Sequence, residues 1–354
     1  MPTALSNFYD LPTSRPRAQQ STQTPEREAS VQADRDSVTL GKRKASWITD
    51  AIAVSQFVGS GVLYKDAADA ATEQKSEKPP YSDAPKVKLD DPFLILPGWT
   101  TLPEKFDDMI AHLLKTPENG DRVVYLKEGQ AYSDKDCTQQ TSIDQSDKIF
   151  LCVYDDVLSP PDKTAPQIAT AVEMIKQNHG EKVDVLGYSM GGVAVRQMLD
   201  RDLEKVDQIA FLGVSHKGSR FAALANYVIK RDINFAMKLA NVNAAHLPAM
   251  QWMLPVDPNN PEASPKLSVL NQNLPHQMEN CTEMYNIGSN GFSTVTKSWG
   301  KSEGGDGLVH FSSTQLEGVP GVVVRGRGLK QHGNLPSDTD AFNELKNYFA
   351  WQEA

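Results

Sequence analysis

Residues 187–191 read Gly-Tyr-Ser-Met-Gly, which places Ser189 between two glycines at the spacing G-x-S-x-G. An apolar run at 183–186 precedes this segment, and Gly192 with a helical run of Ala, Val, Met and Leu follows it. This context predicts a tight strand-to-helix turn, in which small glycines permit a strained backbone and the Ser189 hydroxyl projects from the edge of a sheet. Ser189 is therefore the candidate nucleophile. A glycine-rich turn without chemistry is the alternative.

A serine hydroxyl is a poor nucleophile near neutral pH and needs a base, for which histidine is the usual residue. The chain contains seven histidines. We expect the base in the loop between the last predicted strand, at 319–324, and the final predicted helix, at 338–351. His332 lies in that loop and is the candidate base. A solvated loop histidine is the alternative interpretation.

The acid that orients the base should lie between the serine and the histidine in chain order. Asp306 has that position, in the glycine-rich run 304–307, which permits a sharp turn after a strand. Glu303 and Asp338 are weaker alternatives, and Asp306 could also be a turn residue without a role in chemistry. His310 is too close to Asp306 in sequence to occupy the opposing loop.

Attack on a carbonyl also needs two backbone N–H groups directed at the developing negative charge. We expect one of these N–H groups to come from Met190, the residue after the nucleophile. The segment 96–99, Leu-Pro-Gly-Trp, ends the first central predicted strand and offers the N–H of Trp99 as the other. Met190 and Trp99 are the candidate oxyanion-hole residues.

The elements that must position these residues follow an alternating pattern from Asp91 onward. Short apolar runs alternate with segments of helical period, which indicates an α/β domain with a mostly parallel sheet over 91–354. The predicted strands are 93–96, 122–126, 149–154, 183–186, 208–214, 283–287 and 319–324, and the predicted helices are 103–114, 164–178, 193–203 and 338–351.

The first 90 residues differ in composition from this domain. Residues 1–45 are rich in Ser, Thr, Gln, Pro and charge, which predicts a disordered segment because too little apolar surface can be buried. Residues 46–90 are expected to form a short helix, over the moderately apolar stretch 51–63, and then a linker. A basic run at 42–44 precedes that stretch, but its depth in the chain disfavours a cleavable signal.

Composition excludes several classes of partner. The formal net charge of −9 argues against a nucleic-acid partner, and no run approaches the roughly 18 consecutive apolar residues of a membrane span. Three cysteines leave at least one free thiol per chain: Cys152 lies in an apolar run, and a bond between Cys137 and Cys281 has no support. The compartment stays open between cytoplasm and export by a non-classical route.

Three segments together resemble the bacterial triacylglycerol lipases and related esterases of the α/β-hydrolase superfamily. They are 183–192 with Arg196, the run Val-Ser-His-Lys-Gly-Ser at 214–219, and Gly-Asp-Gly-Leu-Val at 305–309. The resemblance covers about residues 92–350 and implies an α/β-hydrolase fold with an acyl-enzyme mechanism. It also implies the roles of Ser189, His332 and Asp306 given above.

Departures from the family pattern limit what the resemblance implies. Family members usually have His before the oxyanion glycine and before the serine, where this chain has Pro97 and Tyr188. Some carry a structural calcium site with Asp just after the catalytic His, whereas Gly333 and Asn334 follow here. We therefore expect ester hydrolysis without a metal or cofactor. The departures do not favour triglyceride as the substrate.

A long apolar insertion, about 218–283, separates two predicted strands. Its helical spacing predicts a cap over Ser189 that supplies an acyl groove lined by some of Phe235, Met250, Trp252 and Met253. A cap that only completes a core is the other interpretation.

The sequence thus predicts a serine esterase or lipase acting on a carboxylic, lipid-like ester, with brief contact at a membrane or lipid-droplet surface as a further hypothesis. Acyl transfer by the same residues and a non-catalytic binding protein on a hydrolase scaffold are the alternatives. An exported effector that acts on membrane lipid is another biological role for the same chemistry. Oligomeric state, acyl length and alcohol are not predicted.

Overall fold

The computed structural model describes residues 81, 83–239, 242–256, 262, 264–290, 292–294, 303–325 and 332–354. All of them belong to the compact unit 52–354. The predictions of disorder for 1–45 and of a helix within 51–63 lie outside the described residues. No helix of the described ranges is both long and apolar enough to cross a bilayer.

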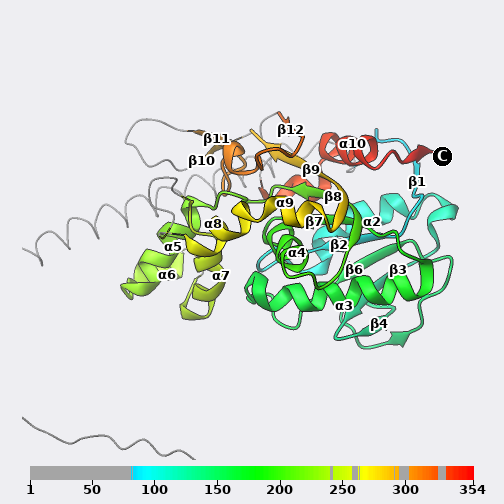
Figure 1. The fold of residues 1–354 in the computed structure, drawn as a ribbon, viewed down its shortest axis with the longest axis horizontal. Coiled ribbons are helices and arrows are strands. Elements are labelled where there is room, and N and C mark those ends of the chain that lie inside the picture. The colour runs from blue at the N-terminus through cyan, green and yellow to red at the C-terminus, as the bar shows by residue number, and fades with distance from the viewer. Residues whose placement is uncertain are drawn as a thin grey trace, which may run out of the picture. The chain divides into compact units, whose positions relative to one another are not determined.

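A nine-stranded sheet forms the centre of the domain, in the order β12-β9-β8-β7-β2-β6-β3-β4-β5 (Figure 1). The pairings from β12 to β3 are parallel, and β4 and β5 extend the sheet as antiparallel strands. The strands are β2 (Phe93–Leu96), β3 (Val123–Lys127), β4 (Gln130–Tyr132), β5 (Gln140–Thr141), β6 (Ile149–Cys152), β7 (Asp184–Tyr188), β8 (Val206–Leu212), β9 (Cys281–Ser289) and β12 (Gly321–Val324).

Both faces of the sheet are covered because successive side chains of a strand point to opposite faces. In β2, Leu94 and Leu96 pack in one apolar cluster with α3 and α4, whereas Phe93 and Ile95 pack in a second cluster with α2 and α10. The helices are α2 (Asp107–Leu113), α3 (Pro161–His179), α4 (Met190–Asp200) and α10 (Thr339–Tyr348). The central strands β2, β6 and β7 are buried along their whole length, which explains their nearly continuous apolar sequences.

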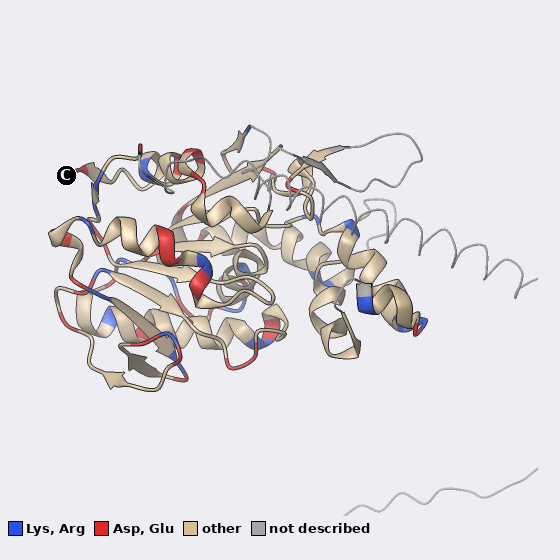
Figure 2. Cartoon of the chain, turned by 180° about the vertical axis from the view of Figure 1, so that it is seen from behind, with Lys and Arg blue, Asp and Glu red and all other residues tan. Residues whose placement is uncertain are grey.

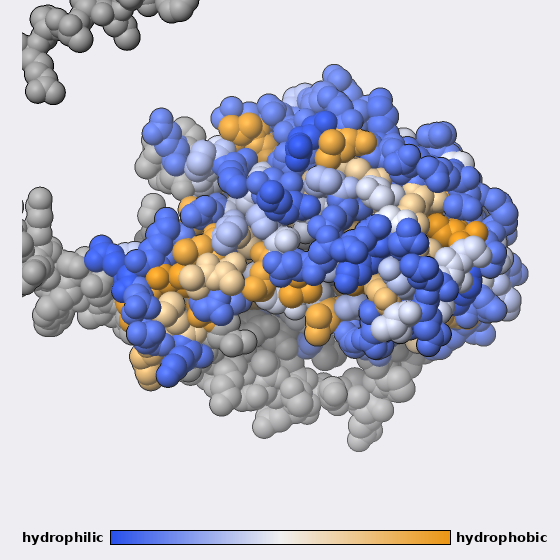
Figure 3. Space-filling view, turned by 90° about the horizontal axis from the view of Figure 1, so that it is seen from below, coloured by the Kyte–Doolittle hydropathy of each residue, from blue (hydrophilic) through white to orange (hydrophobic). Residues whose placement is uncertain are grey.

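The described part of the insertion contains five short α-helices, of which α5, α6 and α7 lie at one side of the domain and α9 lies beside the central sheet (Figure 1). They are α5 (Arg220–Lys230), α6 (Asn234–Leu239), α7 (Leu247–Trp252), α8 (Pro265–Gln272) and α9 (Leu274–Met278). Figure 3 shows apolar and polar surface interspersed at the end of the molecule that carries these helices. Acidic and basic residues are scattered over the described elements (Figure 2).

The predicted linker ends too late in the sequence. Tyr81, Val87 and Leu89 are buried, and β1 (Val87–Lys88) pairs antiparallel with β13 (Gln352–Glu353) near the end of the chain. The domain therefore begins before Asp91, because these apolar side chains complete the core beside α2 and α10. The hairpin of β10 (Phe292–Thr294) and β11 (Glu303–Gly305), and the short strands β4 and β5, were also absent from the predicted elements.

Candidate active site

The turn between β7 and α4 holds Ser189 in a strained conformation. Its backbone has φ 52° and ψ −126°, a region that residues other than glycine rarely adopt. A Cβ at Gly191 would lie 2.4 Å from the carbonyl oxygen of Pro97, so only glycine allows the start of α4 to pack this close to the end of β2. The strain is characteristic of a serine held at the carboxyl edge of a parallel sheet.

Three predicted side chains from distant parts of the chain meet at this edge. His332 Nε2 lies 2.8 Å from Ser189 Oγ, and His332 Nδ1 lies 2.7 Å from Asp306 Oδ2. His332 begins a short 3-10 helix, His332–Ser337, and Asp306 follows β11 directly. Asp306 is fully buried and His332 is 6% exposed, so the carboxylate–imidazole pair is shielded from water.

Backbone groups fix the orientation of the Asp306 carboxylate. Its Oδ1 accepts hydrogen bonds from the N–H groups of Leu308 (3.0 Å) and Val309 (2.7 Å), which leaves Oδ2 for His332. The N–H of His332 donates in turn to the carbonyl of Asp306 at 2.8 Å. The loop 304–309 and the His332 backbone are thus joined by main-chain as well as side-chain contacts.

The alternative acids occupy other places. Asp338 is the N-cap of α10, where its carboxylate accepts the N–H of Ala341 at 2.9 Å. Glu303 is the first residue of β11. His310 forms an isolated β-bridge with Gly305. It therefore lies on the same loop as Asp306, as its spacing from Asp306 predicted.

Tyr188 contacts the imidazole from the strand side, a role that we did not predict from the sequence. Its hydroxyl donates to the carbonyl of His332 at 2.9 Å, and its ring stacks on the imidazole with centroids 5.3 Å apart and an interplanar angle of 30°. The Phe106 ring packs edge-on against the Tyr188 ring, with centroids 5.8 Å apart. The one sequence feature that could have indicated this contact is the position of Tyr188 immediately before Ser189. A residue at this end of the strand lies close to the loops that carry Asp306 and His332.

The two predicted oxyanion-hole residues lie on either side of the serine. Met190 is the first residue of α4, where a backbone N–H has no acceptor within its own helix. Trp99 follows Gly98, and a Cβ at Gly98 would lie 2.7 Å from Ser189 Cβ and 3.2 Å from Ser189 Oγ. The backbone at 98–99 therefore passes within contact distance of the serine.

A cleft of about 500 Å³ opens at Ser189 and His332. Burial lowers the pKa of the Lys105 ammonium in its wall, partly offset by Asp108. Glu104 lies 3.7 Å from Lys135, so its charge is partly balanced by that ion pair. The cleft therefore combines apolar surface with a few polar groups, and its lining is Trp99, Thr100, Thr101, Leu102, Glu104, Lys105, Tyr188, Ser189, Leu308, His332 and Gly333.

The predicted acyl groove is wrong in the residues that were expected to line it. Met250, Trp252 and Met253 are between 2% and 7% exposed, and Phe235 is 68% exposed. Trp252 Nε1 donates to Asp162 of α3 at 2.9 Å, so this side chain anchors the insertion to the main domain. The same apolar spacing is expected for a helix that packs on a core and for a helix that lines a groove. In this structure Met250, Trp252 and Met253 are buried in the core.

Described residues of the insertion contact two residues that line the cleft. Ser219 donates its hydroxyl to the carbonyl of Leu308 at 2.7 Å. The ring of His246, in the short helix Ala244–His246, lies edge-on to the ring of Trp99 with centroids 5.3 Å apart. Trp99 and Leu308 both line the cleft, so the insertion packs against the cleft wall at these two residues.

The parallel sheet with helices on both faces, the strained serine turn after a central strand and the loops that carry the acid and the histidine define an α/β-hydrolase fold. We assign the fold from the strand order and the Ser189 turn.

Comparison with known proteins gives only distant similarities. No family model matches the chain, and no curated protein matches its sequence. Among solved structures, the chain is similar to a lipase from Bacillus licheniformis in mature form, at 16% identity and a TM-score of 0.47 over 77% of this chain and 94% of that one. It is also similar to a gene product from Listeria innocua, at 12% identity and a TM-score of 0.48 over 73% and 93%, and to a metagenomic carboxyl esterase, at 12% and 0.45 over 78% and 82%.

Proposed function

We propose that this chain is a serine hydrolase that cleaves a carboxylic, lipid-like ester through Ser189, His332 and Asp306. The observation that carries the proposal is the continuous hydrogen-bonded series from Asp306 through His332 to Ser189. A base that lies 2.8 Å from the nucleophile and 2.7 Å from an orienting acid is the arrangement that activates a serine hydroxyl.

In the first half of the reaction, Ser189 Oγ attacks the ester carbonyl while His332 Nε2 takes its proton. Asp306 accepts a hydrogen bond from the N–H at His332 Nδ1 and remains ionised, which fixes the tautomer with a free lone pair on Nε2 and stabilises the imidazolium that forms. The N–H groups of Met190 and Trp99 would receive the oxyanion of the tetrahedral intermediate. The imidazolium then protonates the leaving alcohol, which departs and leaves Ser189 acylated.

In the second half, His332 removes a proton from water, which attacks the acyl carbonyl. The imidazolium then returns the proton to Ser189 Oγ as the acyl bond breaks, which releases the acid and restores the free serine and the neutral histidine. The cleft walls suit an ester with an apolar part, since Trp99, Leu102 and Leu308 line it beside Thr100 and Thr101. Tyr188 holds the His332 carbonyl throughout, which keeps the imidazole over the serine while its protonation changes.

The experiment is a panel of p-nitrophenyl esters from acetate to palmitate, with a phospholipid and a triglyceride, assayed with wild type and Ser189→Ala. We expect hydrolysis by wild type and a loss of about 10⁴-fold or more in Ser189→Ala, with an unchanged melting temperature. Ser133→Ala, which alters an exposed loop hydroxyl, is the matched control and should retain full activity. Turnover of all substrates at the Ser189→Ala level by wild type would refute the proposal.

A fluorophosphonate probe separates this proposal from a non-catalytic binding role. Wild type should be labelled on Ser189, since the reagent requires an activated serine, and Ser189→Ala should not. Release of free acid rather than transfer to an added alcohol separates hydrolysis from acyl transfer.

A further inference from the structure

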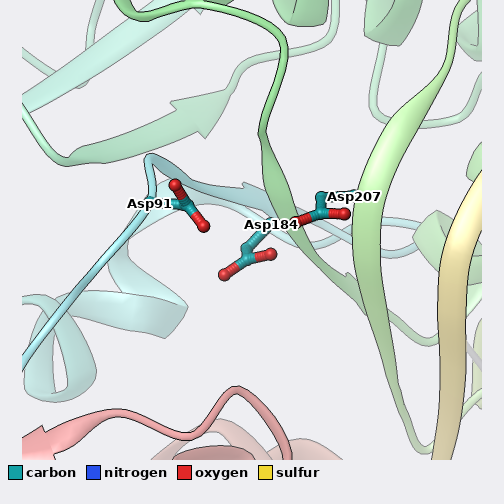
Figure 4. A group of neighbouring side chains, drawn as sticks. All are labelled: Asp91, Asp184 and Asp207. Atoms are coloured by element: carbon teal, nitrogen blue, oxygen red, sulfur yellow. The ribbon is translucent and has the colours of Figure 1, made fainter.

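Three aspartates meet at the end of the sheet opposite to Ser189. Asp91 precedes β2, Asp184 is the first residue of β7 and Asp207 is the second residue of β8. These strands are parallel neighbours, so their amino ends lie side by side, and Figure 4 shows the three side chains grouped there. One carboxylate oxygen from each residue lies within 4.8 Å of the other two.

Asp184 lies deepest in this group. The residue is 4% exposed, and its Oδ1 is buried without a hydrogen-bond donor in the part of the chain that the structure describes. A buried carboxylate oxygen without a donor is costly, so it calls for a cation or a proton. Burial first, and then the charges of Asp91 and Asp207, raise the pKa of Asp184 to about 7.

The nearest ammonium does not meet this requirement. Lys182 Nζ lies 3.7 Å from Asp207 Oδ2 and 4.0 Å from Asp91 Oδ2, and its side chain is 68% exposed. Thr282 donates its hydroxyl to the other oxygen of Asp207. With all three carboxylates ionised, one solvated ammonium faces three negative charges, an excess that one divalent cation would cancel.

We propose that Asp91, Asp184 and Asp207 form a binding site for a divalent cation, with Ca²⁺ as the preferred ion. Ca²⁺ binds oxygen ligands at about 2.3–2.6 Å, so ligands on opposite sides of the ion lie roughly 4.6–5.2 Å apart. For Mg²⁺, at about 2.0–2.1 Å, the corresponding separation is roughly 4.0–4.2 Å. The three oxygen separations, none above 4.8 Å, are compatible with a Ca²⁺ sphere completed by water. Ca²⁺ is preferred because it accepts irregular sets of oxygen ligands, whereas Mg²⁺ demands near-ideal octahedral geometry and gives up its water reluctantly.

The site is structural in this proposal. Asp184 begins β7 and Tyr188 ends it, so the full length of the strand separates the ion from Ser189. An ion held by three neighbouring strands would stabilise the amino edge of the central sheet. Its occupancy is therefore independent of the proposed esterase activity.

The test is thermal unfolding of the full-length protein at pH 8 after treatment with EDTA and removal of the chelator. Added CaCl₂ should raise the melting temperature in a saturable way, by about 5 °C at 100 times the dissociation constant, because the ion binds only the folded state. MgCl₂ should give a smaller shift at the same concentration. Isothermal titration should show one Ca²⁺ per chain.

Asp184→Asn is the decisive variant, since it preserves shape and removes one ligand charge. Its melting temperature should no longer respond to Ca²⁺, whereas Asp136→Asn, an exposed acid in the loop 133–139, should respond as wild type does. No shift in wild type up to 5 mM CaCl₂, or an equal shift in Asp184→Asn, would overturn the proposal. If Asp184→Asn fails to fold, Asp91→Asn tests the same ligand set at its more exposed member.

Discussion

Replacing Asp306 by asparagine tests the proposed mechanism most sharply, because the surrounding backbone decides which way the new amide must point. The N–H groups of Leu308 and Val309 donate to Oδ1 at 3.0 and 2.7 Å. An asparagine would keep both hydrogen bonds only by placing its carbonyl oxygen there. Its NH₂ group would then face His332 Nδ1, where Oδ2 now lies at 2.7 Å.

That orientation forces the wrong tautomer on the imidazole. With a donor opposite Nδ1, His332 must present a lone pair there and carry its proton on Nε2, which faces Ser189 Oγ at 2.8 Å. The histidine can no longer accept the serine proton, and the imidazolium loses its carboxylate. A loss of about 10⁴-fold in kcat is the scale for this change, which corresponds to roughly 5.5 kcal/mol of activation free energy.

The assay is the steady-state kcat on p-nitrophenyl butyrate, together with the melting temperature and the rate of fluorophosphonate labelling. Asp306→Asn should fold, because its size and both backbone hydrogen bonds are retained. Asp338→Asn is the matched control: asparagine caps a helix about as well as aspartate, so the bond from Ala341 persists and activity should stay within about threefold. Activity above a tenth of wild type in Asp306→Asn, or an equal loss in Asp338→Asn, would refute the reasoning.

Three further predictions follow from contacts around the serine and from the buried aspartate. Tyr188→Phe removes the hydrogen bond to the His332 carbonyl and keeps the stacked ring, so kcat should fall by about 2- to 12-fold, the worth of one hydrogen bond; an unchanged kcat would exclude a positioning role. Gly98→Ala places a Cβ 2.7 Å from that of Ser189, so the serine turn must shift, which should cost about 100-fold in kcat/KM and also lower the melting temperature; near-normal labelling by a fluorophosphonate would contradict it. Burial and its acidic neighbours raise the pKa of Asp184 from 3.8 to about 7, so in EDTA the stabilisation is complete below pH 4 and is lost as the pH rises through 7. Urea unfolding should show a decrease of up to roughly 4 kcal/mol across that range, flattened in Asp184→Asn, and equal slopes for the two proteins would contradict it. The charged groups that act on Asp184 are Asp91, Asp207 and Lys182, and burial raises the pKa of nearby Tyr348, which stays neutral over this range.

Much of the fold could be predicted because the determining patterns are local. The apolar runs at 93–96, 149–154 and 183–186 are buried on both faces of the sheet, and that burial is what their composition reports. The Ser189 turn was predictable for a similar reason, because a Cβ at Gly187 or Gly191 would clash with nearby backbone atoms, so the turn requires glycine at these positions. Chain order then placed Asp306 and His332 on loops at the same edge of the sheet.

The elements that escaped prediction depend on contacts between distant segments. Val87 was assigned to a linker, because nothing near it indicates that Gln352 and Glu353 would pair with its strand. The insertion shows the same limit: Trp252 has the apolar character of a groove residue, and only its partner, Asp162 on α3, makes it an anchor.

The alternation of strands and helices, the turn at Ser189 and a short set of candidate acids and bases follow from local sequence patterns. Which of these candidates meet depends on the folded chain, which brings together Ser189 and His332, 143 positions apart, and Asp306 and His332, 26 positions apart. It also brought together the three aspartates at the opposite edge. The physical reason is that hydrophobic periodicity records how deeply a side chain is buried, whereas hydrogen bonds and charge pairs depend on which segment lies beside it.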